Sequence, residues 1–174
     1  MIIVVMGVTG CGKTTLGEEV ALRLGVAFHD ADDYHPAANR AKLQSNIPLD
    51  DDDRRPWLLS LAADMPGWEQ AGGAVLACSA LKKKYRDLLR TGSPDMVFVY
   101  IRGDAATIAG RLKQRAQVGH DLIRDYDQIL AGQFCDLEEP DDAVVVSNLL
   151  VPSEMADEAM RQLSVRGIKP CKKS

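Results

Sequence analysis

Short apolar runs alternate with longer amphipathic stretches along most of the chain. Five of these runs have the length of a strand: Ile2–Met6, Val26–His29, Ala74–Cys78, Met96–Ile101 and Ala143–Val146. All but the second are nearly continuous in apolar residues, which is typical of strands whose two faces are both covered. The pattern therefore predicts a buried parallel sheet.

The stretches between these runs have the spacing of helices, and they cover residues 13–24, 36–43, 54–70, 81–90, 104–115, 125–137 and 153–165. We expect Asp104 and Ser153 to cap two of them and Gly25 to end the first. Strands that alternate with helices predict an α/β fold. Here that means a three-layer sandwich, with a five-stranded parallel sheet between two layers of helices.

The composition limits the function classes. A chain of 174 residues is expected to form a single domain over residues 1–174. Its net charge of −4 argues against a nucleic-acid partner. The four cysteines lack metal-ligand spacing, and Ile2–Met6 is too short to span a membrane or to serve as a signal peptide. We expect reduced thiols, no membrane partner and a cytoplasmic location.

A glycine-rich segment, Gly7-Val8-Thr9-Gly10-Cys11-Gly12-Lys13-Thr14, lies between the first strand and the first helix. In that context backbone N–H groups and the positive end of the helix can bind phosphate. Lys13 would reach the β- and γ-phosphates, and the Thr14 hydroxyl would ligate Mg²⁺. The segment predicts a P-loop that binds a nucleoside triphosphate; the alternative is a chance glycine-rich turn. The expected nucleotide contacts are Gly7, Thr9, Gly10, Cys11, Gly12, Lys13, Thr14 and Thr15.

Two carboxylates, Asp30 and Asp32, follow the second strand at the edge of the sheet where such folds bind ligands. Residues two apart in an extended segment point the same way. One carboxylate near the metal and one near an acceptor hydroxyl would suit phosphoryl transfer, because the second can orient that hydroxyl and take its proton. The alternative is an acidic surface loop.

Cationic residues follow in two further segments. Arg54 comes after four aspartates, Asp50–Asp53, which we expect to cap the next helix. Lys82 and Arg86 are four apart after the third strand, close to Ser79, and are expected to share one helical face. Together these groups could hold a substrate carboxylate or hydroxyls. The alternatives are an ion pair between Arg54 and its acidic neighbours, and a basic surface helix.

A lid is expected over about residues 112–125. Arg111 and Arg115 share a face of the helix after the fourth strand, and a polar stretch follows. Kinase lids commonly bring arginines to the transferring phosphate and exclude water. A surface helix with two arginines is the alternative. His120 has no ligand-spaced partner, so we expect no metal there.

Several of these segments occur in one order along residues 2–147. They are Gly7–Thr14, Asp30–Pro36 with Asn39 and Lys42, Pro48–Asp50 with Asp53-Arg54 and Pro56–Leu58, Ala77–Lys83 with Tyr85, Arg86 and Asp87, and Gln133-Phe134 with Leu137-Glu138. In this order they resemble the gluconate kinase (gluconokinase) family of small P-loop kinases, which is related to shikimate kinase and adenylate kinase. The later segments are more specific than the P-loop, which occurs in many unrelated enzymes.

The resemblance implies a P-loop NTPase fold of the nucleoside-monophosphate-kinase type with a lid, often as a homodimer. It implies that ATP, with Mg²⁺, phosphorylates D-gluconate on its 6-hydroxyl to give 6-phospho-D-gluconate. The implied catalytic residues are Lys13, Asp30, Asp32 and Arg115. Thr14 and Asp30 are the implied metal ligands, and Arg111 would pack near the adenine. The implied substrate-binding residues are Asp32, His35, Arg54, Ser79, Lys82, Arg86 and Gln133.

The expected lid departs from the family pattern. Three residues, Ala116-Gln117-Val118, separate Arg115 from Gly119-His120, and Asp121-Leu122 follows where the family has Phe. The lid is therefore longer and more acidic. Two alternatives stay open beside gluconate phosphorylation: a related kinase for another sugar acid or a polyol, and a nucleotide-binding switch that transfers no phosphate.

Overall fold

The computed structural model describes residues 1–45, 47–117 and 126–170, with the side chains of all these residues except 113–117 and 126. Five strands in this part of the chain form one parallel sheet in the order β2-β3-β1-β4-β5. They are β1 (Ile2–Met6), β2 (Ala27–Asp30), β3 (Ala74–Ala77), β4 (Val97–Arg102) and β5 (Val144–Ser147). The predicted five-stranded parallel sheet is confirmed, and each strand lies within one residue of its expected bounds.

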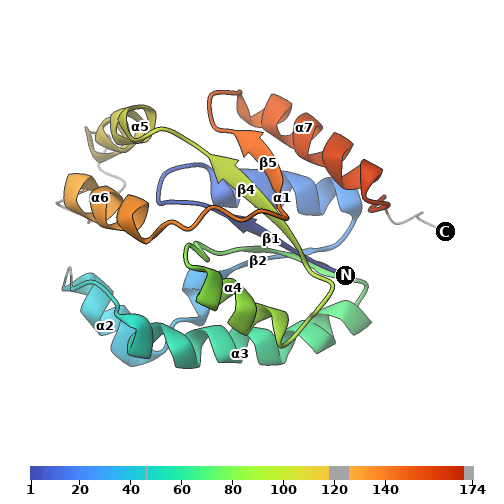
Figure 1. The fold of residues 1–174 in the computed structure, drawn as a ribbon, viewed down its shortest axis with the longest axis horizontal. Helices are drawn as coiled ribbons and strands as arrows, with labels where there is room; N and C mark the ends of the chain where they lie inside the picture. Colours follow the sequence, from blue (N-terminus) through green and yellow to red (C-terminus); the bar gives the residue numbers. More distant parts are fainter. Residues whose placement is uncertain (46, 118–125, 171–174) are drawn as a thin grey trace.

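Helices cover both faces of this sheet. They are α1 (Lys13–Leu24), α2 (Ala37–Gln44), α3 (Asp51–Gln70), α4 (Lys83–Arg90), α5 (Ala105–Gln117), α6 (Tyr126–Asp136) and α7 (Pro152–Val165), with a 3-10 helix, η1 (Ala31–Tyr34). Figure 1 shows α1, α5 and α7 on one side of the sheet and α2, α3 and α4 on the other. The three-layer arrangement is confirmed. No helix in the described ranges is long and apolar enough to cross a bilayer.

The central strand β1 explains the continuous apolar run at the start of the chain. Ile3 and Val5 belong to the core beneath α1 and α7, whereas Ile2, Val4 and Met6 belong to the core beneath α3 and α4. All five side chains are fully buried. Because alternate residues of a strand point to opposite faces, a strand covered on both sides needs apolar residues at every position.

The run of four aspartates caps α3, as predicted, but the helix begins at Asp51 and not at Arg54. The Asp53 backbone N–H donates to the Asp50 carboxylate over 2.9 Å, and the Asp50 N–H donates to the Asp53 carboxylate over 3.1 Å. This reciprocal capping box places three carboxylates in the first turn, where the helix dipole favours them.

The other predicted helix ends had mixed outcomes. Asp104 caps α5, because its carboxylate accepts the Thr107 N–H over 2.9 Å. Gly25 ends α1 in a left-handed conformation, with φ 73°. The prediction for Ser153 was wrong: α7 already begins at Pro152, whose fixed φ suits the first helical position.

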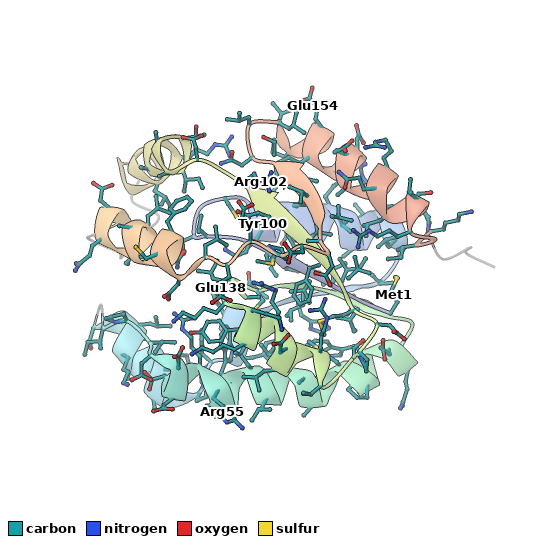
Figure 2. The ribbon with its side chains drawn as sticks, viewed as in Figure 1. Met1, Arg55, Tyr100, Arg102, Glu138 and Glu154 are labelled. Atoms are coloured by element: carbon teal, nitrogen blue, oxygen red, sulfur yellow. The ribbon has the colours of Figure 1, made fainter. Side chains whose placement is uncertain are left out.

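The segment after α6 is attached to the start of α4. The Glu138 carboxylate accepts the Lys83 N–H over 2.5 Å, and the Glu138 N–H donates to the Leu81 carbonyl over 3.0 Å. A carboxylate at a helix N-terminus is favourable for the dipole. Figure 2 shows Glu138 in the space between α6 and α4. This attachment brings the end of α6 to the carboxyl edge of the sheet.

Candidate active site

The P-loop follows β1 and leads into α1. Gly7 has φ 146°, and a Cβ there would lie 2.8 Å from Cys11 Sγ and 3.0 Å from the Ile101 carbonyl oxygen. Gly12, with φ 108°, is the N-cap of α1 and supplies no side-chain cap. The first N–H groups of α1 are therefore available to an anion. Burial raises the pKa of the Cys11 thiol, which keeps it protonated at neutral pH.

Lys13 lies back across the loop, where its Nζ donates to the Val8 carbonyl oxygen over 3.1 Å. This contact holds the ammonium group over the loop that would bind phosphate. A phosphate oxygen would be a stronger partner than a carbonyl, because both groups would then be charged. Thr15, also expected to contact nucleotide, is exposed at the start of α1.

Thr14 and Asp30, which the resemblance pairs as metal ligands, lie together at the carboxyl edge of the sheet. The Thr14 hydroxyl donates to one Asp30 carboxylate oxygen over 3.0 Å, and the other accepts the Asp32 N–H over 3.1 Å. Among the described residues, no cluster of three or more His, Cys, Asp or Glu could hold a metal. One hydroxyl and one carboxylate nevertheless fit Mg²⁺, which usually takes few protein ligands and completes its shell with phosphate and water.

Asp32 lies on η1 beside this pair, with a side chain that is 86% exposed. Partial desolvation raises the pKa of Asp32, and the neighbouring Asp30 carboxylate raises it further, while Lys13 and His35 act in the opposite direction. A carboxylate with a raised pKa is a better proton acceptor. Because water reaches the group, a substrate hydroxyl could reach it as well.

His35 is buried next to Asp32, with 3.7 Å between its Nε2 and an Asp32 carboxylate oxygen. Its ring stacks on Trp57 at 4.1 Å, and the Trp57 indole N–H donates to the Ala31 carbonyl over 2.9 Å. Burial lowers the pKa of His35. Trp57 thus fixes both His35 and the segment that carries Asp32, a role that sequence reasoning missed because a Trp at this spacing is ordinarily a core residue.

The cationic side chains Arg54, Lys82 and Lys84 surround the ring of Tyr85, at 5.7, 5.6 and 5.9 Å from its centroid. Asp51 accepts hydrogen bonds from Lys84, from the Tyr85 hydroxyl over 2.5 Å and from Lys82 over 3.4 Å. The bonds from Lys84 and Tyr85 lower the pKa of Asp51. Burial raises the pKa of Tyr85 to about 12.

Arg54 and Lys82 reach the same side of the site from different elements. The Arg54 Nε donates to the Leu49 carbonyl over 3.3 Å, and Lys82 bridges Asp51 of α3 and Asp136 of α6, 3.1 Å from the latter. Asp51 and Asp136 were not predicted to take part, because neither lies near Lys82 in sequence. Figure 2 shows Arg55, next to Arg54, on the outer side of α3.

The predicted shared helical face of Lys82 and Arg86 was wrong. α4 begins at Lys83, so Lys82 precedes the helix in an extended conformation, with φ −85° and ψ 145°. Arg86 is buried and donates to the Ala80 and Leu81 carbonyls over 3.1 and 2.8 Å. Its position supports the loop after β3; a substrate contact stays a prediction.

Other predicted residues lie at the rim of the P-loop. Ser79 accepts the Gly7 N–H on its carbonyl oxygen over 3.4 Å. Gln133 of α6 bonds Thr9 with both ends of its amide group. Arg111 of α5 donates to the Asn148 carbonyl over 2.6 Å.

The expected lid is only partly described. Residues 112–117 belong to α5, and the rest of the expected lid, 118–125 with His120, lies outside the described residues. Arg115 lies on α5, but its side chain is outside the described part. The prediction that it serves the transferring phosphate therefore stays a prediction.

Comparison with proteins of known family shows which family this chain belongs to. The family model of shikimate kinase matches residues 9–164. The thermoresistant gluconokinase of Escherichia coli strain K12 is 45% identical to this chain over 140 residues, which are 80% of this chain and 77% of that protein. The chain belongs to the gluconokinases, within the shikimate kinase family.

Solved structures agree with this membership of the gluconokinase family. A sugar kinase from Janibacter sp. HTCC2649 is 39% identical with a TM-score of 0.83, over 97% of this chain and 95% of that one. A gluconokinase from Sinorhizobium meliloti 1021 is 34% identical, also with a TM-score of 0.83, over 94% of this chain and 91% of that one. The predicted family and the P-loop kinase fold are confirmed.

Proposed function

We propose that this protein transfers the γ-phosphate of ATP to the 6-hydroxyl of D-gluconate and releases 6-phospho-D-gluconate and ADP. The observation that carries the chemistry is the continuous chain from Thr14 through Asp30 to Asp32, directly beside the P-loop. Membership of the gluconokinase family supports gluconate as the acceptor.

On the nucleotide side, Lys13 would leave the Val8 carbonyl and bind a phosphate oxygen. The Thr14 hydroxyl and the Asp30 carboxylate would hold Mg²⁺, which when bound neutralises charge on the phosphates. The first N–H groups of α1 add a fixed positive potential. Arg111 is proposed to pack near the adenine, and Arg115 to serve the transferring phosphate.

On the acceptor side, Asp32 would accept a hydrogen bond from the 6-hydroxyl, orient it toward the phosphate and take its proton. His35, which stacks on Trp57, lies on one side of the Asp32 carboxylate. Arg54 and Lys82 would bind the gluconate carboxylate, which would take the place of Asp51 and Asp136 as partners of Lys82. Arg54 and Lys82 are both cations, and a cation binds a carboxylate more strongly than a neutral hydroxyl, so an acidic acceptor is favoured.

The test compares Asp32→Asn with Asp33→Asn, its exposed neighbour on η1. The amide that replaces the Asp32 carboxylate would accept no proton, so we expect turnover with gluconate to fall at least ~100-fold while ATP binding is retained. Asp33→Asn should behave as wild type. Equal turnover in the two variants would remove Asp32 from the mechanism.

The cytoplasmic location and the homodimer expected from the sequence stay predictions.

A further inference from the structure

Gln133 contacts the P-loop through both ends of its side-chain amide. The Thr9 backbone N–H donates to Gln133 Oε1 over 2.6 Å, and Gln133 Nε2 donates to the Thr9 hydroxyl over 3.0 Å. The two residues are 124 positions apart in the chain, so only the fold brings them together. One side chain thus satisfies the backbone and the hydroxyl of the same loop residue.

The helix α6 that carries Gln133 is anchored by residues that precede and follow Gln133 in the sequence. Leu130, one turn earlier, is buried in the core beneath α1 and α7, and Phe134 packs against that core. Glu138, just beyond the helix, is attached to the start of α4. Gln133 is therefore presented from a fixed helix, and its amide can support Thr9, which lies between the buried core side chains of Val8 and Cys11.

The backbone conformation of the P-loop benefits from such support. Gly10, the residue after Thr9, is left-handed with φ 77°. Glycines permit this conformation but do not enforce it, because their backbone freedom is larger than that of any other residue. The bonds to Gln133 restrict the middle of the loop. They also fix the Thr9 N–H toward α6, which leaves phosphate binding to the other N–H groups of the loop.

We propose that Gln133 is a positioning residue for the P-loop: it acts through Thr9 to hold the loop ready for nucleotide and does not bind the acceptor. This differs from the acceptor contact that the resemblance implies for Gln133. The proposal rests on the proposed function for its kinetic readout, but its nucleotide-binding readout needs no acceptor.

The test is a double-mutant cycle of Gln133→Met with Thr9→Val and Thr9→Ser. Methionine keeps the length of the side chain and removes both hydrogen bonds, valine removes only the Thr9 hydroxyl, and serine keeps it. Gln70→Met, at the exposed end of α3, is the matched control. Thermal unfolding of each variant verifies the fold. The readouts are the Kd for ADP without acceptor, and kcat and the KM values for ATP and gluconate.

At roughly threefold per hydrogen bond, Gln133→Met should raise the Kd for ADP and the KM for ATP about tenfold, with the KM for gluconate within about twofold of wild type. In the Thr9→Val background the same change should cost only about threefold, because one of the two bonds is already gone. In the Thr9→Ser background, which keeps the hydroxyl, Gln133→Met should again raise the Kd for ADP and the KM for ATP about tenfold.

Two results would overturn the proposal. One is a raised KM for gluconate with unchanged ADP affinity, which would make Gln133 an acceptor contact. The other is an effect of Gln133→Met that is the same in the Thr9→Val and Thr9→Ser backgrounds, which would show that it does not act through the Thr9 hydroxyl. If wild type phosphorylates no gluconate, the proposed function fails while the ADP cycle still decides the role of Gln133.

Discussion

Asp32 combines solvent access with a raised pKa, for which partial desolvation is the first cause and the neighbouring Asp30 carboxylate the second. The Asp32 backbone N–H donates to the Asp30 carboxylate, and the negative charge of Asp30 opposes the ionisation of Asp32. Burial lowers the pKa of His35, which weakens the positive charge by which this ring would lower the pKa of Asp32. Together these influences raise the pKa of Asp32, so its carboxylate accepts a proton more readily than that of an isolated aspartate.

The pH profile should report this environment. Asp32 acts as a base only when ionised, so kcat/KM for gluconate should fall as the pH drops through its pKa. Because that pKa is raised, the acidic limb should lie above the ordinary aspartate value of about 3.9. The measurement is kcat/KM against pH, with stability recorded at each point. An acidic limb at or below that value would contradict the assignment of Asp32.

At the scale of elements, α3 separates its charges between two sides. Arg54 faces Tyr85 and the site, whereas Arg55 is exposed on the outer side of the helix. The helix also contributes Asp51, which holds Lys82 and Lys84 before any acceptor arrives. A single capped helix thus presents both a cation for the acceptor and the carboxylate that the acceptor would replace.

Replacement of Arg54 and of Arg55 should have different effects on the KM for gluconate, because the two side chains lie on different sides of α3. Arg54→Gln is expected to raise the KM for gluconate at least ~10-fold, because the acceptor carboxylate loses a charge-assisted hydrogen bond. Arg55→Gln is the matched control and should leave the KM near that of wild type. Steady-state kinetics at saturating ATP measure the difference. Similar KM values in the two variants would argue against Arg54 as an acceptor contact.

The loop between β3 and α4 depends on one buried guanidinium. Arg86 satisfies the carbonyls of Ala80 and Leu81, and Ala80 has a left-handed φ of 43°, which is unfavourable for a residue with a Cβ. Arg86 therefore stabilises a strained turn at the edge of the site.

Arg86→Met should accordingly lower the free energy of unfolding by about 1–3 kcal/mol, because two carbonyls lose their partner. Denaturant unfolding measures the loss. Lys83→Met, on the exposed side of the same helix, is the control and should cost little. Unchanged stability with a raised KM for gluconate would instead favour the acceptor contact that the resemblance implies.

At the scale of the whole molecule, the sequence predicted those features that depend on local pattern. The strands and the P-loop context follow from the hydrophobic period, and the common edge of a parallel sheet accounts for Asp30 and Asp32 lying at the ligand-binding edge; the pairing of Asp30 with Thr14 was implied by the resemblance. The partners of Lys82 and Gln133 could not be predicted in this way, because Asp51, Asp136 and Thr9 reach them only through tertiary packing. Lys82 was misplaced for a local reason: α4 begins one residue after it.

The most direct test of the account is ADP release with Mg-ATP in the presence of gluconate, another aldonic acid, shikimate, a neutral polyol or no acceptor. We expect strong stimulation by gluconate, with ³¹P NMR placing the new phosphate on its 6-oxygen, and little stimulation by shikimate or the polyol. Preferred phosphorylation of shikimate, or ATP binding without transfer to any acceptor, would contradict the account.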